Sequence, residues 1–144
     1  MVQDLSDEMI RGILESCRVL AVVGMSRDPG KAAGRVPRYL AMRGFTVIPV
    51  NPNAETIEGR QGYSKLSEVT EDIDAVVIFR PSEEVWPVVE EAVARKRRRG
   101  DLRVVWMQEG IRDEAAARLA EGEGLMVVQD RCMAKEYRRL YETA

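Results

Sequence analysis

Five short runs of apolar residues recur along this chain of 144 residues, and each run is nearly continuous rather than alternating. They cover residues 19–23, 46–50, 75–79, 103–107 and 125–128 and are rich in β-branched side chains. A strand that is covered on both faces needs no polar alternation, so such runs are typical of a parallel sheet with helices on either side. The pattern therefore predicts an α/β fold with a parallel sheet of about five strands.

Helical segments separate the apolar runs and complete this pattern. We expect crossover helices at 32–42, 83–99 and 112–121, and further helices at 6–16 and 132–141. Gly44, Gly100 and Gly122 follow the three crossover segments, as glycine commonly does where a helix ends, and Ser82 is the expected N-cap of the second crossover helix. Strands that alternate with helices predict a single-domain, Rossmann-like, doubly wound sheet with the strand order 3-2-1-4-5 and helices on both faces.

Length and charge limit what this domain can do. The chain is long enough for one domain, expected over 1–144 with a core at about 10–140. A formal net charge of −2 supplies no global positive field for nucleic acid or anionic lipid. No leader peptide opens the chain, no apolar run approaches the roughly 20 residues of a membrane-spanning helix, and two cysteines are too few for a disulfide framework. We therefore expect a soluble, cytoplasmic protein without nucleic-acid or membrane partners.

The chain contains no histidine, which removes the commonest general base near neutral pH and the commonest transition-metal ligand. The basic run 95–99 is interpreted as a solvated face at a helix C-terminus, where cations complement the helix dipole. Nucleic-acid binding through this run is the weaker alternative.

The loop after the first apolar run reads Gly-Met-Ser-Arg-Asp-Pro-Gly-Lys from residue 24 to 31. Backbone N–H groups in such a loop, and at the start of the next helix, can face an anion, and phosphate is the natural ligand. The Ser26 hydroxyl and the cations Arg27, Lys31 and Arg35 are candidates to assist. The dinucleotide fingerprint fails because Ser26 stands where a glycine is required, and the Walker A pattern fails because Ala32 follows the lysine. The loop predicts phosphate binding without phosphoryl transfer.

Three further loops are expected at the same edge of the sheet. Asn51 and Pro52 end the second strand in a stiff turn, and Phe79, Arg80 and Pro81 follow the third. Arg80 either holds a phosphate or pairs with a carboxylate. Gln108 and Gly110 follow the fourth strand and are expected beside the first loop, across a reversal between strands 1 and 4, whereas Trp106 is expected in the core.

Taken in order, VVGMS, the later lysine, VIPVNP, FRP, WMQEGI and DRCMAKE resemble the small stand-alone CoA-binding protein family over roughly residues 10–140. That family is similar in fold to the CoA-binding amino-terminal domain of the succinyl-CoA synthetase α subunit. The resemblance implies a Rossmann-type fold and coenzyme A or an acyl-CoA as ligand. It also implies that Gly24, Met25 and Ser26, with Lys31 and Arg35, surround the phosphates. By the same resemblance, Asn51, Pro52 and residues 79–81 border the adenine and ribose, and Gln108 and Gly110 lie toward the pantetheine arm.

The resemblance does not carry ligase chemistry, because the larger synthetases use a phosphorylated histidine in a second domain and this chain has no histidine. We therefore interpret the chain as a non-catalytic CoA-binding protein whose partners are a CoA-type ligand and a CoA-using enzyme. Two enzymatic alternatives stay open: an NAD(P)-linked oxidoreductase, and thiol exchange with CoA through Cys132. Arg131 and a helix N-terminus beside Cys132 would favour its thiolate.

Overall fold

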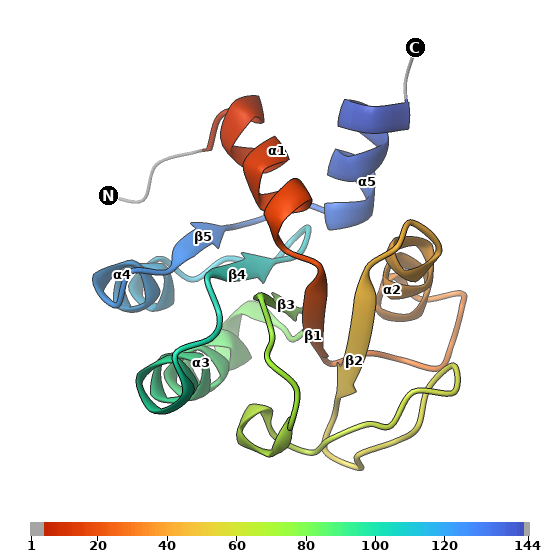
Figure 1. Ribbon diagram of the computed structural model, residues 1–144, viewed down its shortest axis with the longest axis horizontal. Helices are drawn as coiled ribbons and strands as arrows, with labels where there is room; N and C mark the ends of the chain where they lie inside the picture. The colour runs from red at the N-terminus through yellow and green to blue at the C-terminus, as the bar shows by residue number, and fades with distance from the viewer. Residues whose placement is uncertain (1–4, 143–144) are drawn as a thin grey trace.

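The computed structural model describes residues 5–142 as a parallel sheet surrounded by helices (Figure 1). In chain order the elements are α1 (Asp7–Ser16), β1 (Val19–Val23), α2 (Ala32–Met42), β2 (Thr46–Val50), η1 (Leu66–Glu68), β3 (Ala75–Ile78), η2 (Ser82–Glu84), α3 (Val85–Arg99), β4 (Val104–Met107), α4 (Glu114–Gly122), β5 (Met126–Val128), α5 (Met133–Tyr137) and η3 (Arg138–Glu142). The predicted α/β, Rossmann-like class is confirmed.

The strands form one sheet in the order β2-β1-β3-β4-β5, and every pairing is parallel. The predicted order 3-2-1-4-5 is therefore wrong: β2 lies at an edge, and β3 lies beside β1. Pro49 gives the physical reason, because a proline has no N–H for the ladder and is tolerated at a sheet edge rather than in an interior strand. Its carbonyl oxygen faces outward and accepts a hydrogen bond from the Tyr63 N–H at 3.0 Å. The sheet consequently reverses between β1 and β3, not between strands 1 and 4.

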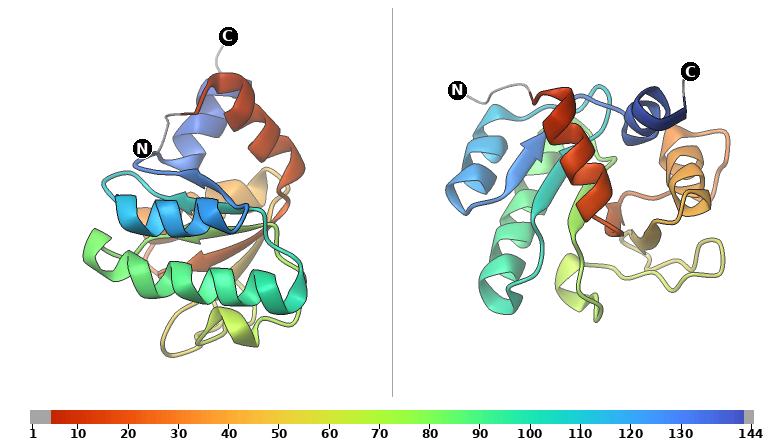
Figure 2. Two further views of the ribbon diagram at one scale, coloured as in Figure 1. Left: turned by 90° about the vertical axis from the view of Figure 1, so that its left-hand side faces the viewer. Right: turned by 45° about the horizontal axis from the view of Figure 1, so that its top comes forward.

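Two apolar layers cover the two faces of the sheet, as the continuous runs predict. On one face α1, α2 and α5 pack on alternate strand residues such as Leu20, Val77 and Trp106. On the other face α3 and α4 pack on the intervening residues, among them Val76 and Val105. Figure 2 shows the helices on both sides of the sheet.

Several helix ends differ from the predictions. Ser82 does not cap α3: it begins the short 3-10 helix η2, and its hydroxyl accepts the Arg112 N–H at 2.9 Å. Glu84 occupies the N-cap position of α3 without a side-chain capping hydrogen bond. Gly122 lies inside α4, and Gly124 adopts the left-handed φ of 83° that follows the helix. The closing helix is short because α5 turns into a π-helical segment, η3, after Tyr137.

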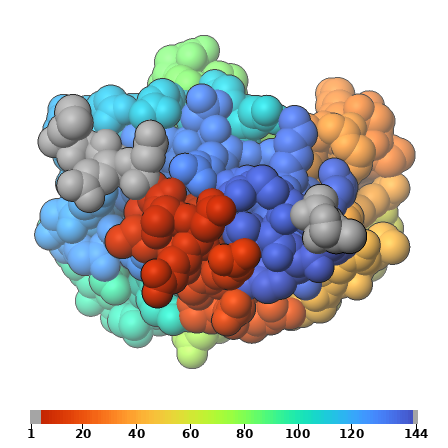
Figure 3. All heavy atoms as spheres, turned by 90° about the horizontal axis from the view of Figure 1, so that it is seen from above, coloured from red at the N-terminus to blue at the C-terminus, as the bar shows by residue number. Residues whose placement is uncertain are grey.

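The C-terminal segment lies against α1 on the surface, as Figure 3 shows. Arg139 donates to the Asp7 carboxylate at 2.8 and 3.0 Å, and the Tyr141 hydroxyl donates to Glu15 at 2.6 Å. These contacts fasten the last helix to the first helix across one face of the sheet.

The basic run 95–99 is not simply a solvated face. Arg95 is fully buried and donates to the carbonyl oxygens of Leu66, Val69 and Glu71 at 2.6, 2.9 and 2.7 Å. Its guanidinium also pairs with the Asp101 carboxylate at 3.0 Å. This arginine holds the segment before β3 against α3, whereas Arg98 is exposed.

Candidate functional site

The four predicted loops meet at the carboxyl edge of the sheet because three hydrogen bonds join the strand ends. The Gly24 N–H donates to the Val50 carbonyl at 2.8 Å, and the Phe79 N–H donates to the Val23 carbonyl at 2.9 Å. The Gln108 N–H donates to the Ile78 carbonyl at 3.2 Å. The loops therefore lie side by side in the order β2, β1, β3, β4, and the first loop stands at the reversal, where ligands of open α/β sheets bind.

Pro37 shapes the first loop from inside α2. A proline donates no hydrogen bond to the carbonyl four residues earlier, so the Ala33 carbonyl is left without its helical partner. The Ser26 N–H donates to that carbonyl at 3.1 Å and draws the loop onto the helix. Gly34 permits this approach, since a Cβ there would lie 2.1 Å from the Asp28 carbonyl oxygen. A proline and a glycine in one helix thus fix the loop.

The first loop leaves several backbone donors without acceptors. Within residues 5–142 no hydrogen bond is made by the N–H groups of Met25 and Arg27 or, in the first turn of α2, of Ala32 and Ala33. These groups, with the helix N-terminus, suit an anion. The Ser26 N–H is committed to the helix, although its hydroxyl, which accepts the Asp28 N–H at 3.0 Å, can still donate.

The cations near this loop divide into two groups. Lys31 and Arg35 are exposed at the start of α2, where neither forms an ion pair within the described residues. Arg27 instead pairs with Glu55 at 3.0 Å and donates to the Thr56 carbonyl at 3.1 Å, so it joins the first loop to the segment after β2. Arg80 adopts the carboxylate pairing of its two predicted alternatives, with Glu84 as partner.

Asn51 follows β2, and within residues 5–142 only the oxygen of its side-chain amide is hydrogen-bonded. Its Oδ1 accepts the N–H groups of Asn53 and Glu55 at 3.2 and 3.1 Å, which closes the Pro52 turn. Its Nδ2 is buried and has no hydrogen-bond partner within the described part of the chain. A buried donor without a partner costs folding free energy, so it marks a place where a ligand acceptor would be favourable.

Gln108, on the other side of the first loop, also has a buried side-chain amide nitrogen without a partner in the described structure. The residue is 3% exposed, and its Nε2 has no hydrogen-bond partner among the described residues. The expectation that strand 4 lies beside strand 1 is wrong, because β3 separates them. Gln108 nevertheless reaches α2, since it lines a cleft of about 340 Å³ together with Ala33, Arg35 and Phe79.

The remaining walls of this cleft were missed by the sequence reasoning, apart from Cys132. Val36 and Ile111 add apolar surface, and Cys132 is buried at the N-cap of α5. Across the cleft mouth the Lys135 ammonium contacts the Glu109 carboxylate at 2.8 Å, and this bond raises the pKa of Lys135. The sequence held a signal for Lys135, because a residue one helical turn after Cys132 lies on the same side of the predicted closing helix.

Other predicted residues lie outside the cleft. Met25 belongs to the first loop and is buried. Gly110 takes a left-handed φ of 83° beyond Gln108, where its N–H donates to Asp130 at 2.6 Å. Trp106 is fully buried, as expected, and donates to the Arg131 carbonyl at 2.7 Å. Among residues 5–142 no cluster of three or more metal-ligating side chains occurs, and no helix is both long and apolar enough to cross a membrane.

An open parallel sheet with a crevice at its reversal defines the class of Rossmann-like α/β proteins. Residues 18–138 match the family described as the CoA binding domain, and this chain belongs to that family.

The similarity to this chain covers nearly all of some relatives and only a small part of others. An uncharacterized protein of Bacillus subtilis, YneT, is 33% identical over 92% of this chain and 94% of its own length. A hypothetical protein from Pyrococcus horikoshii, whose structure is solved, is 33% identical, with a TM-score of 0.88 over 97% of both chains. An ADP-forming acetate–CoA ligase of Archaeoglobus fulgidus is 29% identical over 66% of this chain but only 14% of the ligase. The domain therefore occurs both in small proteins and as a minor part of larger ligases.

Proposed function

We propose that this protein binds coenzyme A or an acyl-CoA without catalysing a reaction on it. The observation that carries the proposal is the pair of buried, unpartnered amides, Asn51 Nδ2 and Gln108 Nε2, on either side of a loop with free backbone donors. Membership of the CoA binding domain family supports the choice of ligand. CoA offers the matching chemistry, with phosphates at one end and a chain of amide carbonyls at the other.

The proposed arrangement follows the order of the loops. Phosphate oxygens would accept from the first-loop N–H groups, the Ser26 hydroxyl and the exposed cations of α2. The base and ribose would lie against the Asn51-Pro52 turn and residues 79–81. The pantetheine arm would enter the cleft of about 340 Å³, where Gln108 Nε2 would donate to an amide carbonyl, with Gly110 beyond it.

A non-catalytic role is supported by the chemistry of the side chains that line the cleft. The chain has no histidine, and the charged pair at the cleft mouth is exposed to water rather than held against a reacting centre. Family membership does not favour the NAD(P)-linked oxidoreductase or the Cys132 thiol-exchange alternative. A protein that binds without turnover would act by delivering its ligand to, or reporting it to, an enzyme that uses CoA.

The test is calorimetric titration of the ligand-stripped protein with CoA and with acetyl-CoA. Parallel titrations with NAD, NADP and ATP serve as controls for binding through phosphate groups in general. All titrations use the same salt concentration, because the affinity contributed by phosphate contacts depends on salt. We expect saturable binding of the CoA compounds and an unchanged thioester absorbance when acetyl-CoA is incubated with the protein. Preference for a nicotinamide nucleotide would contradict the ligand, and thioester loss that depends on the protein would contradict the non-catalytic role.

A further inference from the structure

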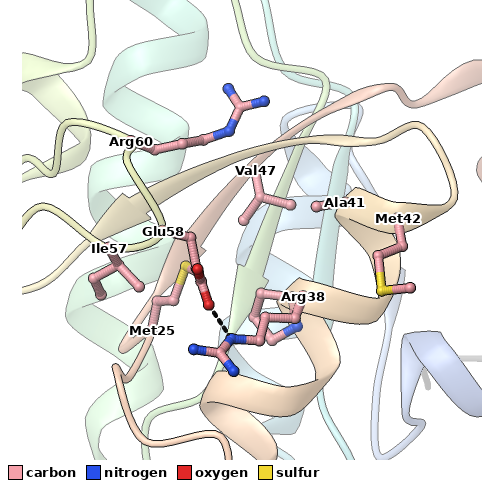
Figure 4. A pocket seen from close by; sticks show the side chains of 9 residues that line it. Met25, Arg38, Ala41, Met42, Val47, Ile57, Glu58 and Arg60 are labelled. Atoms are coloured by element: carbon pink, nitrogen blue, oxygen red, sulfur yellow. Dashed lines mark ion pairs between the residues drawn. The ribbon is translucent and has the colours of Figure 1, made fainter.

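A second hollow lies away from the cleft, between α2, β2 and the turn at 57–60 (Figure 4). Its volume is about 420 Å³, within the range of pockets that hold small molecules. Met25, Pro37, Val47 and Ile57, all of them buried, supply an apolar lining. The hollow is therefore a preformed apolar site that shares only Met25 with the proposed CoA contacts, through the side chain here and through the backbone N–H there.

A tight turn forms one wall of the hollow. Ile57 and Arg60 exchange two backbone hydrogen bonds of 3.0 Å, and the two residues between them, Glu58 and Gly59, have φ of 53° and 74°. Positive φ at both central positions is the geometry of a type I′ hairpin turn, which is rigid. The turn thus holds the side chains of Glu58 and Arg60 at the rim of the hollow.

The charges at this rim are unbalanced. The Arg38 guanidinium pairs with the Glu58 carboxylate across the opening, as the dashed line in Figure 4 marks. Arg60, the second guanidinium of the lining, has neither an ion pair nor a side-chain hydrogen bond within residues 5–142. An apolar lining with one unbalanced positive charge is complementary to a molecule with an apolar body and one negative charge.

We propose that this hollow binds a small aliphatic carboxylate, with the hydrocarbon chain on Met25 and Val47 and the carboxylate on Arg60. Arg60 is exposed, so a neutral hydrocarbon would gain no charge-assisted bond from it, and an ammonium compound would be repelled by the excess positive charge. The proposal does not depend on CoA binding, because the hollow and the cleft that contains Gln108 share no lining residue and only the backbone N–H of Met25 is assigned to CoA.

The experiment is a titration of the full chain, labelled with ¹³C in the methionine methyl groups, with hexanoate. Met25 and Met42 line the hollow, whereas Met126 and Met133 do not, so the methyl signals locate the ligand within the molecule. We expect saturable shifts of the Met25 and Met42 signals with hexanoate and none with hexylammonium, which has the same chain and the opposite charge. Equal shifts with the two compounds would overturn the proposal.

Three variants separate the hollow from the rest of the surface. Arg60→Gln should weaken hexanoate binding at least tenfold, whereas Arg118→Gln, which removes an exposed arginine of α4, should leave it unchanged. Ala41→Phe should block the site without unfolding the protein, because Ala41 is exposed on the wall of the hollow. Gln108→Leu should bind hexanoate as the wild type does. Wild-type affinity in Arg60→Gln or Ala41→Phe, or loss of binding in Gln108→Leu, would overturn the placement.

Discussion

Buried polar side chains at the two ends of the sheet differ in their hydrogen bonding. Near the amino ends of β3 and β4, the buried Arg95 donates to three carbonyl oxygens and pairs with Asp101. At the carboxyl edge, the amide nitrogens of Asn51 and Gln108 are buried without any partner in the described structure. A folded chain normally satisfies its buried donors, so the two exceptions at one edge are the donors that the proposed function assigns to a ligand.

Under the proposed function, this contrast separates a residue that stabilises the fold from two residues that would bind the ligand. Removing a satisfied buried group should lower the free energy of unfolding and leave the intrinsic affinity for CoA unchanged. Removing an unsatisfied one should lower the affinity and leave the stability unchanged. The predictions below test each side in turn.

Arg95→Met should produce the largest effect, a loss of about 3–5 kcal/mol of unfolding free energy. The substitution leaves the Asp101 carboxylate and three carbonyl oxygens buried without their shared donor. Urea unfolding followed by circular dichroism measures the change, and Arg98→Met, on the exposed side of the same helix, is the matched control with an expected change under about 0.5 kcal/mol. Similar losses in both variants would show that Arg95 stabilises the fold no more than an exposed arginine of the same helix does.

Gln108→Leu should give the reverse result. Leucine nearly preserves the volume and removes a buried donor that makes no bond, so the unfolding free energy should stay within about 1 kcal/mol of wild type or rise. CoA binding should weaken by about 1–3 kcal/mol, measured by calorimetry, because a ligand carbonyl loses its donor. A variant that is strongly destabilised but binds CoA normally would show that Gln108, like Arg95, stabilises the fold and does not bind the ligand.

Lys31→Ala and Arg35→Ala should each weaken CoA binding by about 1 kcal/mol. Charge-assisted bonds to phosphate are strong, but both side chains are exposed, so water and salt screen part of the interaction. Arg98→Ala is the control for a general loss of positive charge. The loss of affinity should shrink as salt is raised, and identical affinities for all three variants would place the phosphates away from α2.

The sequence predicted the strands, the fold class and the four loops because continuous apolar runs and their flanking residues are local signals. The strand order failed although its signal was present: Pro49 requires an edge strand, and an interior second strand was nevertheless assumed. The burial of Arg95 has no local signal, since its partners lie 6 to 29 residues away in the chain. The unsatisfied amides of Asn51 and Gln108 also depend on tertiary packing, so their residue types were predictable and their lack of partners was not.

The smallest effect is expected where ion pairs are exposed, at the C-terminal segment. Glu142 accepts hydrogen bonds from Arg43 and Tyr39, and these bonds lower the pKa of Glu142 to about 2, from a model-compound value of 4.5. A pKa that folding lowers contributes stability above the unfolded value, and this contribution is lost as pH falls through the folded value. The unfolding free energy should therefore decrease between about pH 4.5 and pH 2.

Glu142→Gln should remove this part of the acid dependence, measured as the difference between the urea midpoints of the two proteins at a series of pH values. The difference should be largest above pH 4.5 and vanish toward pH 2, because the wild-type side chain is then protonated as well. Raising the salt concentration should reduce the difference, since the Arg43–Glu142 pair is partly exposed, unlike the pair of Arg95 with Asp101. A difference that persists unchanged to pH 2 would mean that Glu142 acts through packing rather than through its charge.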